Sequence, residues 1–192
     1  MLQEKLSNYN IILASNSPRR QQFLRDLHLD FEIQTKNVDE IYPKHLQETE
    51  ITDYLAVLKA KPFNNLSEKD LLITSDTIVW YKNEALGKPK NEEDAFKTLK
   101  KLSGQTHKVI TSVSIKSKKF KKVFNDTTLV TFKELSNEEI KFYIKNYQPF
   151  DKAGAYGIQD WIGKIGITNL KGCYFNVMGL PVQKLYKELM NL

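Results

Sequence analysis

Two adjacent arginines, Arg19 and Arg20, stand where a short apolar run meets a predicted helix, and they are the first side chains in the chain that could do chemistry. Residues 11–14 are apolar, which predicts a buried strand. Ser17 and Pro18 are typical of a helix start, because serine can cap the helix and proline suits its first turn. Unpaired N–H groups at a helix N-terminus favour an anion, and two guanidinium groups add charge and bidentate geometry. The stretch therefore predicts an anion site suited to a polyphosphate, although two adjacent arginines can also simply solvate a helix start.

A single carboxylate, that of Asp76, interrupts an apolar and β-branched run at residues 71–80. Such a run predicts a buried strand. A charge inside a buried strand is costly unless it is paired, hydrogen-bonded or bound to a metal. Two interpretations follow from these residues alone: Asp76 lies at an exposed strand end, or it has a function.

Two glycines and an amide stand close together within residues 151–160. Gly154 and Gly157 allow unusual dihedral angles and a close approach of the backbone to a ligand. Gln159 offers both a hydrogen-bond donor and an acceptor. The stretch is therefore suited to contacting the edge of a nucleotide base.

These stretches, taken in order with two others, resemble the motifs of the Maf family of nucleoside triphosphate pyrophosphatases. The resemblance covers nearly the whole chain, and it departs from the usual family pattern at Gln148, commonly glutamate, and at Asp160, usually glycine. The similar segments are Leu-Ala-Ser-Asn-Ser-Pro-Arg-Arg at 13–20, Asp-Thr at 76–77, Leu-Ser-Gly-Gln-Thr-His at 102–107, Lys-Ala-Gly-Ala-Tyr-Gly-Ile-Gln at 152–159 and Asn-Val-Met-Gly-Leu-Pro at 176–181.

The resemblance implies both a fold and a reaction. The expected fold is a single α/β domain over residues 1–192, similar to ITPase-like enzymes, with a mixed, curved sheet, packed helices and a deep cleft between two lobes. The expected reaction is metal-dependent hydrolysis of a nucleoside triphosphate to the monophosphate and pyrophosphate, with homodimers common in the family. A pyrophosphatase for 7-methyl-GTP or for a broader range of nucleotides is the alternative enzyme. From another class, a non-catalytic nucleotide- or nucleic-acid-binding regulator of cell division is the alternative.

The resemblance also implies roles for individual residues. Asp76 is expected to be the catalytic base and, together with Glu40, a ligand of Mg²⁺ or Mn²⁺, which prefer hard oxygen ligands. Without the resemblance, Glu40 would be a solvated loop acid and Lys59 a surface lysine. Arg19, Thr77 and Gln159 match the subgroup that acts on dTTP and UTP, and a different residue stands at the position of Arg19 in the 7-methyl-GTP subgroup. The residues expected to bind the substrate are Ser15, Arg19, Arg20, Lys59, Thr77, Lys88 and Gln159.

Capping residues and periodicity indicate the elements that must position these side chains. Thr49 can cap a helix that carries Lys59 and stops near Pro62. His107 begins a predicted strand, where a lone histidine is more often structural than catalytic. The other expected elements are a strand at 31–34, a helix capped by Asn91 that ends at 103–104, two strands of a hairpin at 106–115 and 123–132, a helix from the capping box at 136–139 to about 147, and a closing helix with Leu185 and Leu189 on one face.

The composition sets the class of protein. At 192 residues and 41% hydrophobic content, the chain can bury a core as one domain, and its only cysteine, Cys173, excludes an internal disulfide. No charged and then apolar leader precedes Ile11, and no apolar run approaches the roughly 20 residues of a membrane span, so the expectation is a cytoplasmic protein without a membrane partner. The net charge of +6 depends partly on lysines at 116–122, which predict a solvated hairpin end, and no aromatic pattern favours nucleic acid.

Overall fold

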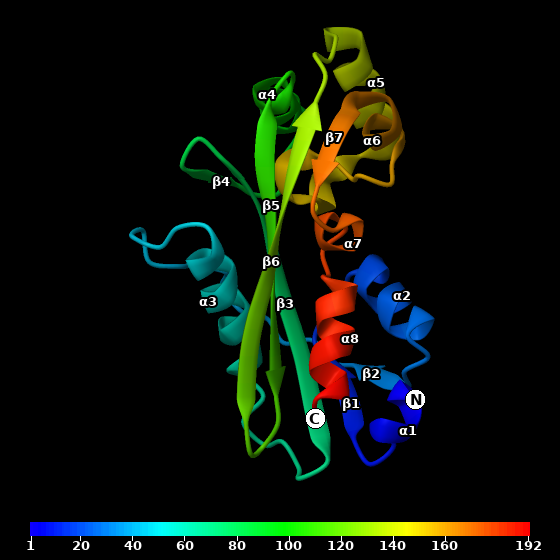
Figure 1. Cartoon of the computed structure of the whole chain (residues 1–192). Coiled ribbons are helices and arrows are strands. Elements are labelled where there is room, and N and C mark those ends of the chain that lie inside the picture. Colours follow the sequence, from blue (N-terminus) through cyan, green and yellow to red (C-terminus); the bar gives the residue numbers. More distant parts are fainter. The chain divides into compact units, whose positions relative to one another are not determined.

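The structure is a computed structural model that describes all residues from 1 to 192, and its centre is a mixed seven-stranded sheet (Figure 1). The strand order is β2-β1-β3-β5-β6-β7, with β4 paired to β3. Strand β1 runs parallel to β2 and β3, whereas β4 is antiparallel to β3 and β7 is antiparallel to β6. The expected mixed α/β fold is thus confirmed. The strands are β1 (Asn10–Leu13), β2 (Phe31–Ile33), β3 (Asp70–Tyr81), β4 (Glu84–Leu86), β5 (Thr106–Lys116), β6 (Lys121–Phe132) and β7 (Ile167–Lys171).

Eight α-helices and two 3₁₀ turns accompany the sheet. None of the helices combines the length and the apolar character needed to cross a membrane. The helices are α1 (Leu2–Lys5), α2 (Pro18–Asp26), α3 (Thr49–Ala60), α4 (Glu92–Leu102), α5 (Asn137–Tyr147), α6 (Trp161–Gly166), α7 (Tyr174–Val177) and α8 (Val182–Met190), and the 3₁₀ turns are η1 (Pro149–Asp151) and η2 (Ala153–Ala155).

The predicted helix starts are mostly confirmed. The Asn91 side chain accepts a hydrogen bond from a first-turn N–H of α4, and Ser136 forms the expected capping box of α5. The capping role of Thr49 is wrong, because Thr49 is the first residue of α3 and Glu48 precedes it without a side-chain capping bond. Ser17 does precede α2, but its side chain makes no capping bond.

Two short strands, β4 and β7, were not expected from the sequence. Strand β4 has only three residues, 84–86, which are too few to show a strand periodicity. Residues 167–171 have half-buried and exposed side chains with no regular alternation. Both strands exist because a longer neighbour, β3 or β6, offers them backbone hydrogen-bonding partners.

The chain divides into two compact units, and the boundaries fall inside β3, β5 and β6 and between α7 and α8. The first unit comprises residues 1–76, 111–126 and 179–192, and the second comprises residues 77–110 and 127–178. In the first unit, α3 lies on one side of β3, and α2 and α8 lie on the other side (Figure 1). These two sides of β3 carry the two halves of the candidate site.

Each unit has its own hydrophobic core. In the first unit, α3 and the residues after it pack on β1 and β3 through Ile12, Ala60, Phe63 and Leu72. In the second unit, the largest cluster joins α4, α5 and the segment around Tyr156. Burial of these side chains fixes the elements that carry the polar residues described below.

Candidate active site

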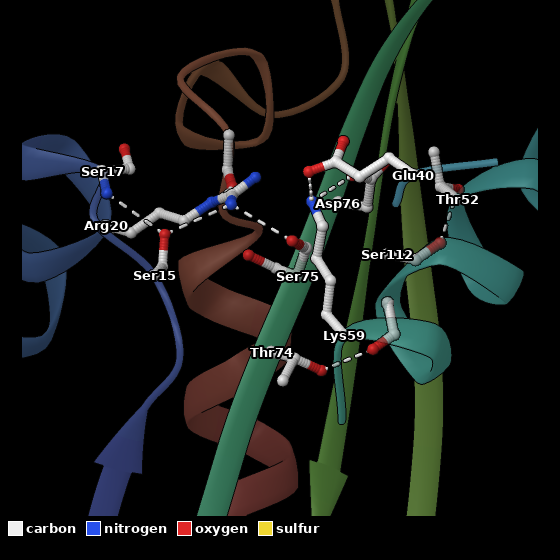
Figure 2. Close-up of polar contacts among 12 residues, drawn as sticks. Ser15, Ser17, Arg20, Glu40, Thr52, Lys59, Thr74, Ser75, Asp76 and Ser112 are labelled. Atoms are coloured by element: carbon white, nitrogen blue, oxygen red, sulfur yellow. Dashed lines mark hydrogen bonds and ion pairs between the residues drawn. The ribbon is translucent and has the colours of Figure 1, made fainter. Parts of the chain in front are cut away.

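The carboxylate of Asp76 lies in the middle of β3 and is almost fully buried. The alternative of an exposed strand end is therefore wrong. The ammonium group of Lys59 lies 2.6 Å from Asp76 Oδ1 and 3.0 Å from Glu40 Oε1, so that one cation joins two carboxylates (Figure 2). The surface-lysine interpretation of Lys59 is also wrong, because only 19% of this side chain is exposed.

Helix α3 brings Lys59 to Asp76 because polar side chains fix it against the sheet. The hydroxyl of Thr74 donates to the carbonyl of Ala56, in the turn of α3 that precedes Lys59. Thr74 and Asp76 point to the same face of β3, as the two-residue period of a strand requires. On the neighbouring strand β5, the Ser112 hydroxyl donates to Asp53 Oδ1 at 2.6 Å, near the start of α3.

Burial raises the pKa of the Asp76 carboxyl above its usual value, because removal from water penalises the charged form. The positive charges of Lys59 and Arg20 oppose this rise, whereas the negative charge of Glu40 adds to it. A carboxylate with a raised pKa is a stronger base than an exposed aspartate, and the ammonium group of Lys59 holds it in place. The arrangement can therefore accept a proton from a bound water molecule.

Arg20 lies on the other side of β3, and two of its hydrogen bonds go to backbone carbonyls. Its Nε donates to the Gly179 carbonyl at 2.8 Å, and its Nη1 donates to the Ser75 carbonyl at 3.1 Å. Nη1 also lies 3.5 Å from the Ser15 hydroxyl, which accepts a hydrogen bond from the Ser17 N–H (Figure 2). The guanidinium group thus connects the start of α2 to β3 and to Gly179, which lies three residues before the start of α8.

The two carboxylates, Glu40 and Asp76, are suitable ligands for a divalent ion. Both contact the ammonium group of Lys59, at 2.6 Å for Asp76 and 3.0 Å for Glu40. No group of three or more His, Cys, Asp or Glu side chains is arranged to hold a metal ion. Mg²⁺ commonly binds one or two carboxylates together with substrate phosphates, and the donor set fits that mode.

The structure brings five of the predicted residues together in the first unit: Ser15 with Arg20, and Glu40 with Lys59 and Asp76. Arg19 is half-buried beside them in the first turn of α2. The remaining predicted substrate residues belong to the second unit. They are Thr77, half-buried and next to Asp76 in the chain; Lys88, exposed in the loop after β4; and Gln159, half-buried in the glycine-containing stretch.

Sequence reasoning missed Ser75 and Gly179, which bind Arg20 through backbone carbonyls. Every residue has such a carbonyl, so no residue type marks these two positions. It also missed Thr74 and Ser112, although hydroxyls inside apolar strands are a usable signal of buried polar contacts.

His107 is structural, as expected: it is buried, its Nε2 lies 2.7 Å from the Tyr156 hydroxyl, and burial lowers its pKa to about 4.

Comparison with solved structures defines the fold class. The chain is similar to the Ham1 protein of Staphylococcus aureus with a TM-score of 0.55, at 17% identity, over 95% of this chain and 98% of that one. It is also similar to a HAM1 protein from Coxiella burnetii, with a TM-score of 0.53 at 14% identity, over 96% of this chain and 100% of that one. At such low identity these likenesses concern the fold alone.

Sequence comparison defines the family. The pattern described as "Maf-like protein" matches residues 10–192, and the chain therefore belongs to the Maf family. Its relatives include a dTTP/UTP pyrophosphatase from Flavobacterium psychrophilum, 60% identical over 100% of this chain and 98% of the relative. Another, from Flavobacterium johnsoniae, bears the same name and is 58% identical over 100% of both chains.

Proposed function

We propose that this protein hydrolyses dTTP and UTP to the nucleoside monophosphate and pyrophosphate. The observation that carries the proposal is the buried Asp76 carboxylate, held by Lys59 in a chain 58–60% identical to full-length dTTP/UTP pyrophosphatases. An isolated buried carboxylate would be costly, and a buried ion pair is a weak source of stability. A catalytic role explains this pair, in which Asp76 lies in β3 and Lys59 reaches it from α3.

In the proposed mechanism, Asp76 orients a water molecule and accepts its proton. The water oxygen forms a bond to the α-phosphorus, and the bond from that phosphorus to the oxygen bridging the α and β phosphates breaks. Pyrophosphate leaves with the electron pair of the broken bond. Lys59 keeps the Asp76 carboxylate in position, and the raised pKa of Asp76 makes proton transfer from water less unfavourable than for an exposed aspartate.

Positive side chains would offset the charge that develops on the triphosphate. Lys59, Lys88 and Arg20 are the proposed phosphate-facing cations, and electrostatic stabilisation is usually the largest contribution to phosphoryl transfer. Arg20 already donates to two backbone carbonyls, so we assign it a second task, that of fixing the start of α2 and its N–H groups. Ser15 supports Arg20 at the same helix start.

A divalent ion, Mg²⁺ or Mn²⁺, is part of the proposal. Glu40 and Asp76 would hold it, since both offer hard oxygen ligands close to the same ammonium group. When bound, such an ion lowers the pKa of the attacking water and neutralises phosphate charge. A homodimer and a cytoplasmic location remain predictions from the resemblance and the composition.

The base is proposed to contact Gln159, Thr77 and Arg19. The Oε1 atom of Gln159 is buried and has no hydrogen-bond partner in the protein. Such an acceptor favours a ligand N–H, and uracil and thymine carry one N–H between two carbonyls. A purine such as 7-methylguanine is larger and presents a different edge, so it would leave polar groups of the site unpaired.

The experiment is a comparison of kcat/KM over a panel that contains dTTP, UTP, CTP and 7-methyl-GTP, with pyrophosphate release as the signal. We expect UTP and dTTP to exceed 7-methyl-GTP. The substitution Gln159→Ala should lower kcat/KM for UTP by about 5- to 30-fold, the scale of one lost hydrogen bond, and should change the 7-methyl-GTP value less. A wild type that prefers 7-methyl-GTP would favour the alternative enzyme, and a wild type without turnover would favour a non-catalytic binding protein.

A further inference from the structure

Gln159 lies on a tight turn formed by residues 157–160. The Asp160 N–H donates to the Gly157 carbonyl at 3.1 Å, so that Ile158 and Gln159 occupy the two central positions of the turn. The Gln159 amide therefore depends for its direction on whatever holds residues 157 and 160. Both of these residues are bound by the same side chain.

That side chain is Tyr143, which is fully buried on α5. Its hydroxyl donates to Asp160 Oδ2 at 2.7 Å and accepts a hydrogen bond from the Gly157 N–H at 3.0 Å. Burial and the neighbouring Asp160 carboxylate raise the pKa of the Tyr143 hydroxyl above its usual value. The hydroxyl therefore stays protonated and remains a donor at neutral pH. One hydroxyl thus closes the turn from both ends.

Close packing leaves little freedom to the turn. A Cβ on Gly157 would lie 2.6 Å from Asp160 Oδ2 and 3.0 Å from Gln159 Nε2, so the carboxylate and the amide nitrogen both adjoin that bare backbone position. On the other side, a Cβ on Gly163 would lie 1.9 Å from the Ile158 carbonyl oxygen. The glycines allow these close approaches, and a side chain at position 157 or 163 would force its neighbours to shift.

The family usually has glycine at position 160, whereas this chain has Asp160, whose carboxylate contacts Tyr143. It occupies the N-cap position of α6, yet its side chain makes no capping bond and accepts the Tyr143 hydroxyl instead. A carboxylate near the Nε2 end of the Gln159 amide attracts the NH₂ group and repels the amide oxygen. This charge favours the orientation in which Oε1 is the buried acceptor without a partner.

We infer that Tyr143 and Asp160 are positioning residues for base selection: together they fix the turn and the amide orientation of Gln159, so that Oε1 accepts the ring N–H of uracil or thymine. The inference rests on the proposed base-reading role of Gln159. Cytosine is nearly the same size as uracil but presents an acceptor nitrogen in place of that N–H. The ratio of kcat/KM for UTP to that for CTP therefore measures the amide orientation rather than the size of the site.

The test compares two tyrosines of the same helix. Tyr143→Phe removes the hydroxyl that closes the turn, and we expect the UTP-to-CTP ratio to fall by about 5- to 30-fold. Tyr147→Phe is the matched control, since Tyr147 stacks on Tyr143 and is 41% exposed; this variant should keep the wild-type ratio. A folded Tyr143→Phe variant with the wild-type ratio would overturn the inference.

Two variants of Asp160 keep the test decisive if Tyr143→Phe does not fold. Asp160→Asn retains an oxygen that can accept the Tyr143 hydroxyl, whereas Asp160→Ala does not. We expect Asp160→Asn to keep more of the UTP-to-CTP ratio than Asp160→Ala, and equal ratios in the two variants would contradict the inference.

Gln159→Ala distinguishes the base-reading role of Gln159 from the positioning role of Tyr143 and Asp160. If Gln159→Ala abolishes the preference for UTP while the Tyr143 and Asp160 variants do not, the positioning inference fails and the base-reading proposal stands. If Gln159→Ala leaves the wild-type ratio unchanged, both fail.

Discussion

Two regions of the first unit contain lysines paired with carboxylates, and they differ in burial. In the site on β3, the side chains of Lys59 and Asp76 are 19% and 6% exposed, with their charged atoms 2.6 Å apart. At the turn between β5 and β6, Lys118 and Glu68 are 58% and 53% exposed, at 3.0 Å, and Lys119 pairs with the same glutamate. The distances between the charged atoms are similar in both places, but the pair on β3 is shielded from water and the pairs at the turn are not.

The difference shows which charges can affect chemistry. Water and salt screen the exposed pairs at the turn, and such pairs contribute little to stability. In the buried site, burial raises the pKa of Asp76, and the charges of Lys59, Arg20 and Glu40 act on the same carboxyl. Substitutions in the buried site should therefore have large effects on turnover, and substitutions at the turn between β5 and β6 should have small ones.

The largest effect is expected from Asp76→Asn, which keeps the shape of the side chain and removes the base. We expect turnover of UTP to fall by about 10²- to 10⁴-fold or more, because a positioned base contributes on that scale. Nucleotide binding, measured by calorimetry, should remain within a few-fold of wild type. A variant that retains turnover within ten-fold of wild type would remove Asp76 from the catalytic role.

Lys59→Ala should lower kcat/KM by roughly 10- to 200-fold, the scale of one lost charge-assisted hydrogen bond. Lys88→Ala should lower kcat/KM by a similar factor, because Lys88 is the other lysine proposed to bind phosphate. Only Lys59→Ala should also change the pH profile, since Lys59 is paired with the base and Lys88 lies exposed in a loop. This contrast distinguishes a lysine that acts on the substrate alone from one that also acts on the base.

The direction of the pH change follows from the charges around Asp76. The active form is the carboxylate, so kcat/KM should rise with pH as Asp76 loses its proton. Lys59 opposes the rise of this pKa, and removing Lys59 leaves burial and the Glu40 charge to raise it further. The acidic limb of the profile should therefore move to higher pH in Lys59→Ala. An unchanged limb would mean that another group controls the proton transfer.

Arg20→Lys tests a half-buried cation that donates to two backbone carbonyls. A lysine cannot reproduce the fork that reaches the carbonyls of Ser75 and Gly179 together. We expect the free energy of unfolding in urea to fall by about 1–3 kcal/mol, because a carbonyl left without its donor carries a desolvation cost. Arg25→Lys, on the exposed side of α2, is the control and should change it little.

Many elements of the fold were predictable from the sequence, because their signals are local. Asn91 and Ser136 mark helix starts through side chains that bind their own first turn. The apolar run around Asp76 predicted the buried strand, although not that Asp76 lies in its middle. Local sequence cannot show which α3 residue reaches Asp76, because that contact joins positions 17 residues apart.

Other features of the site were unpredictable for a different reason. The carbonyls that bind Arg20 have no side-chain signature, and the Tyr143 contact with Asp160 depends on how α5 packs against a turn. The family resemblance supplied the expected site residues, and only the folded structure supplies their contacts. Contacts between distant segments are set by packing of both cores, which no short motif encodes.

The smallest effect is expected at the lysine-rich turn. Replacing Lys118 and Lys119 together by glutamine should leave kcat/KM for UTP within about two-fold of wild type, because both side chains are exposed and pair with an exposed glutamate. Glu68→Gln is the complementary control, since it leaves both lysines and raises the positive charge of the turn.

Binding of a fluorescent single-stranded DNA by the wild type, the double lysine variant and Glu68→Gln should be weak at 150 mM salt, about the physiological ionic strength. Tight binding by wild type that the double variant loses would make the turn a nucleic-acid contact and would favour the regulator over the enzyme. Equal activity and equally weak binding would show that burial, not the number of lysines, decides which charges of this protein have a function.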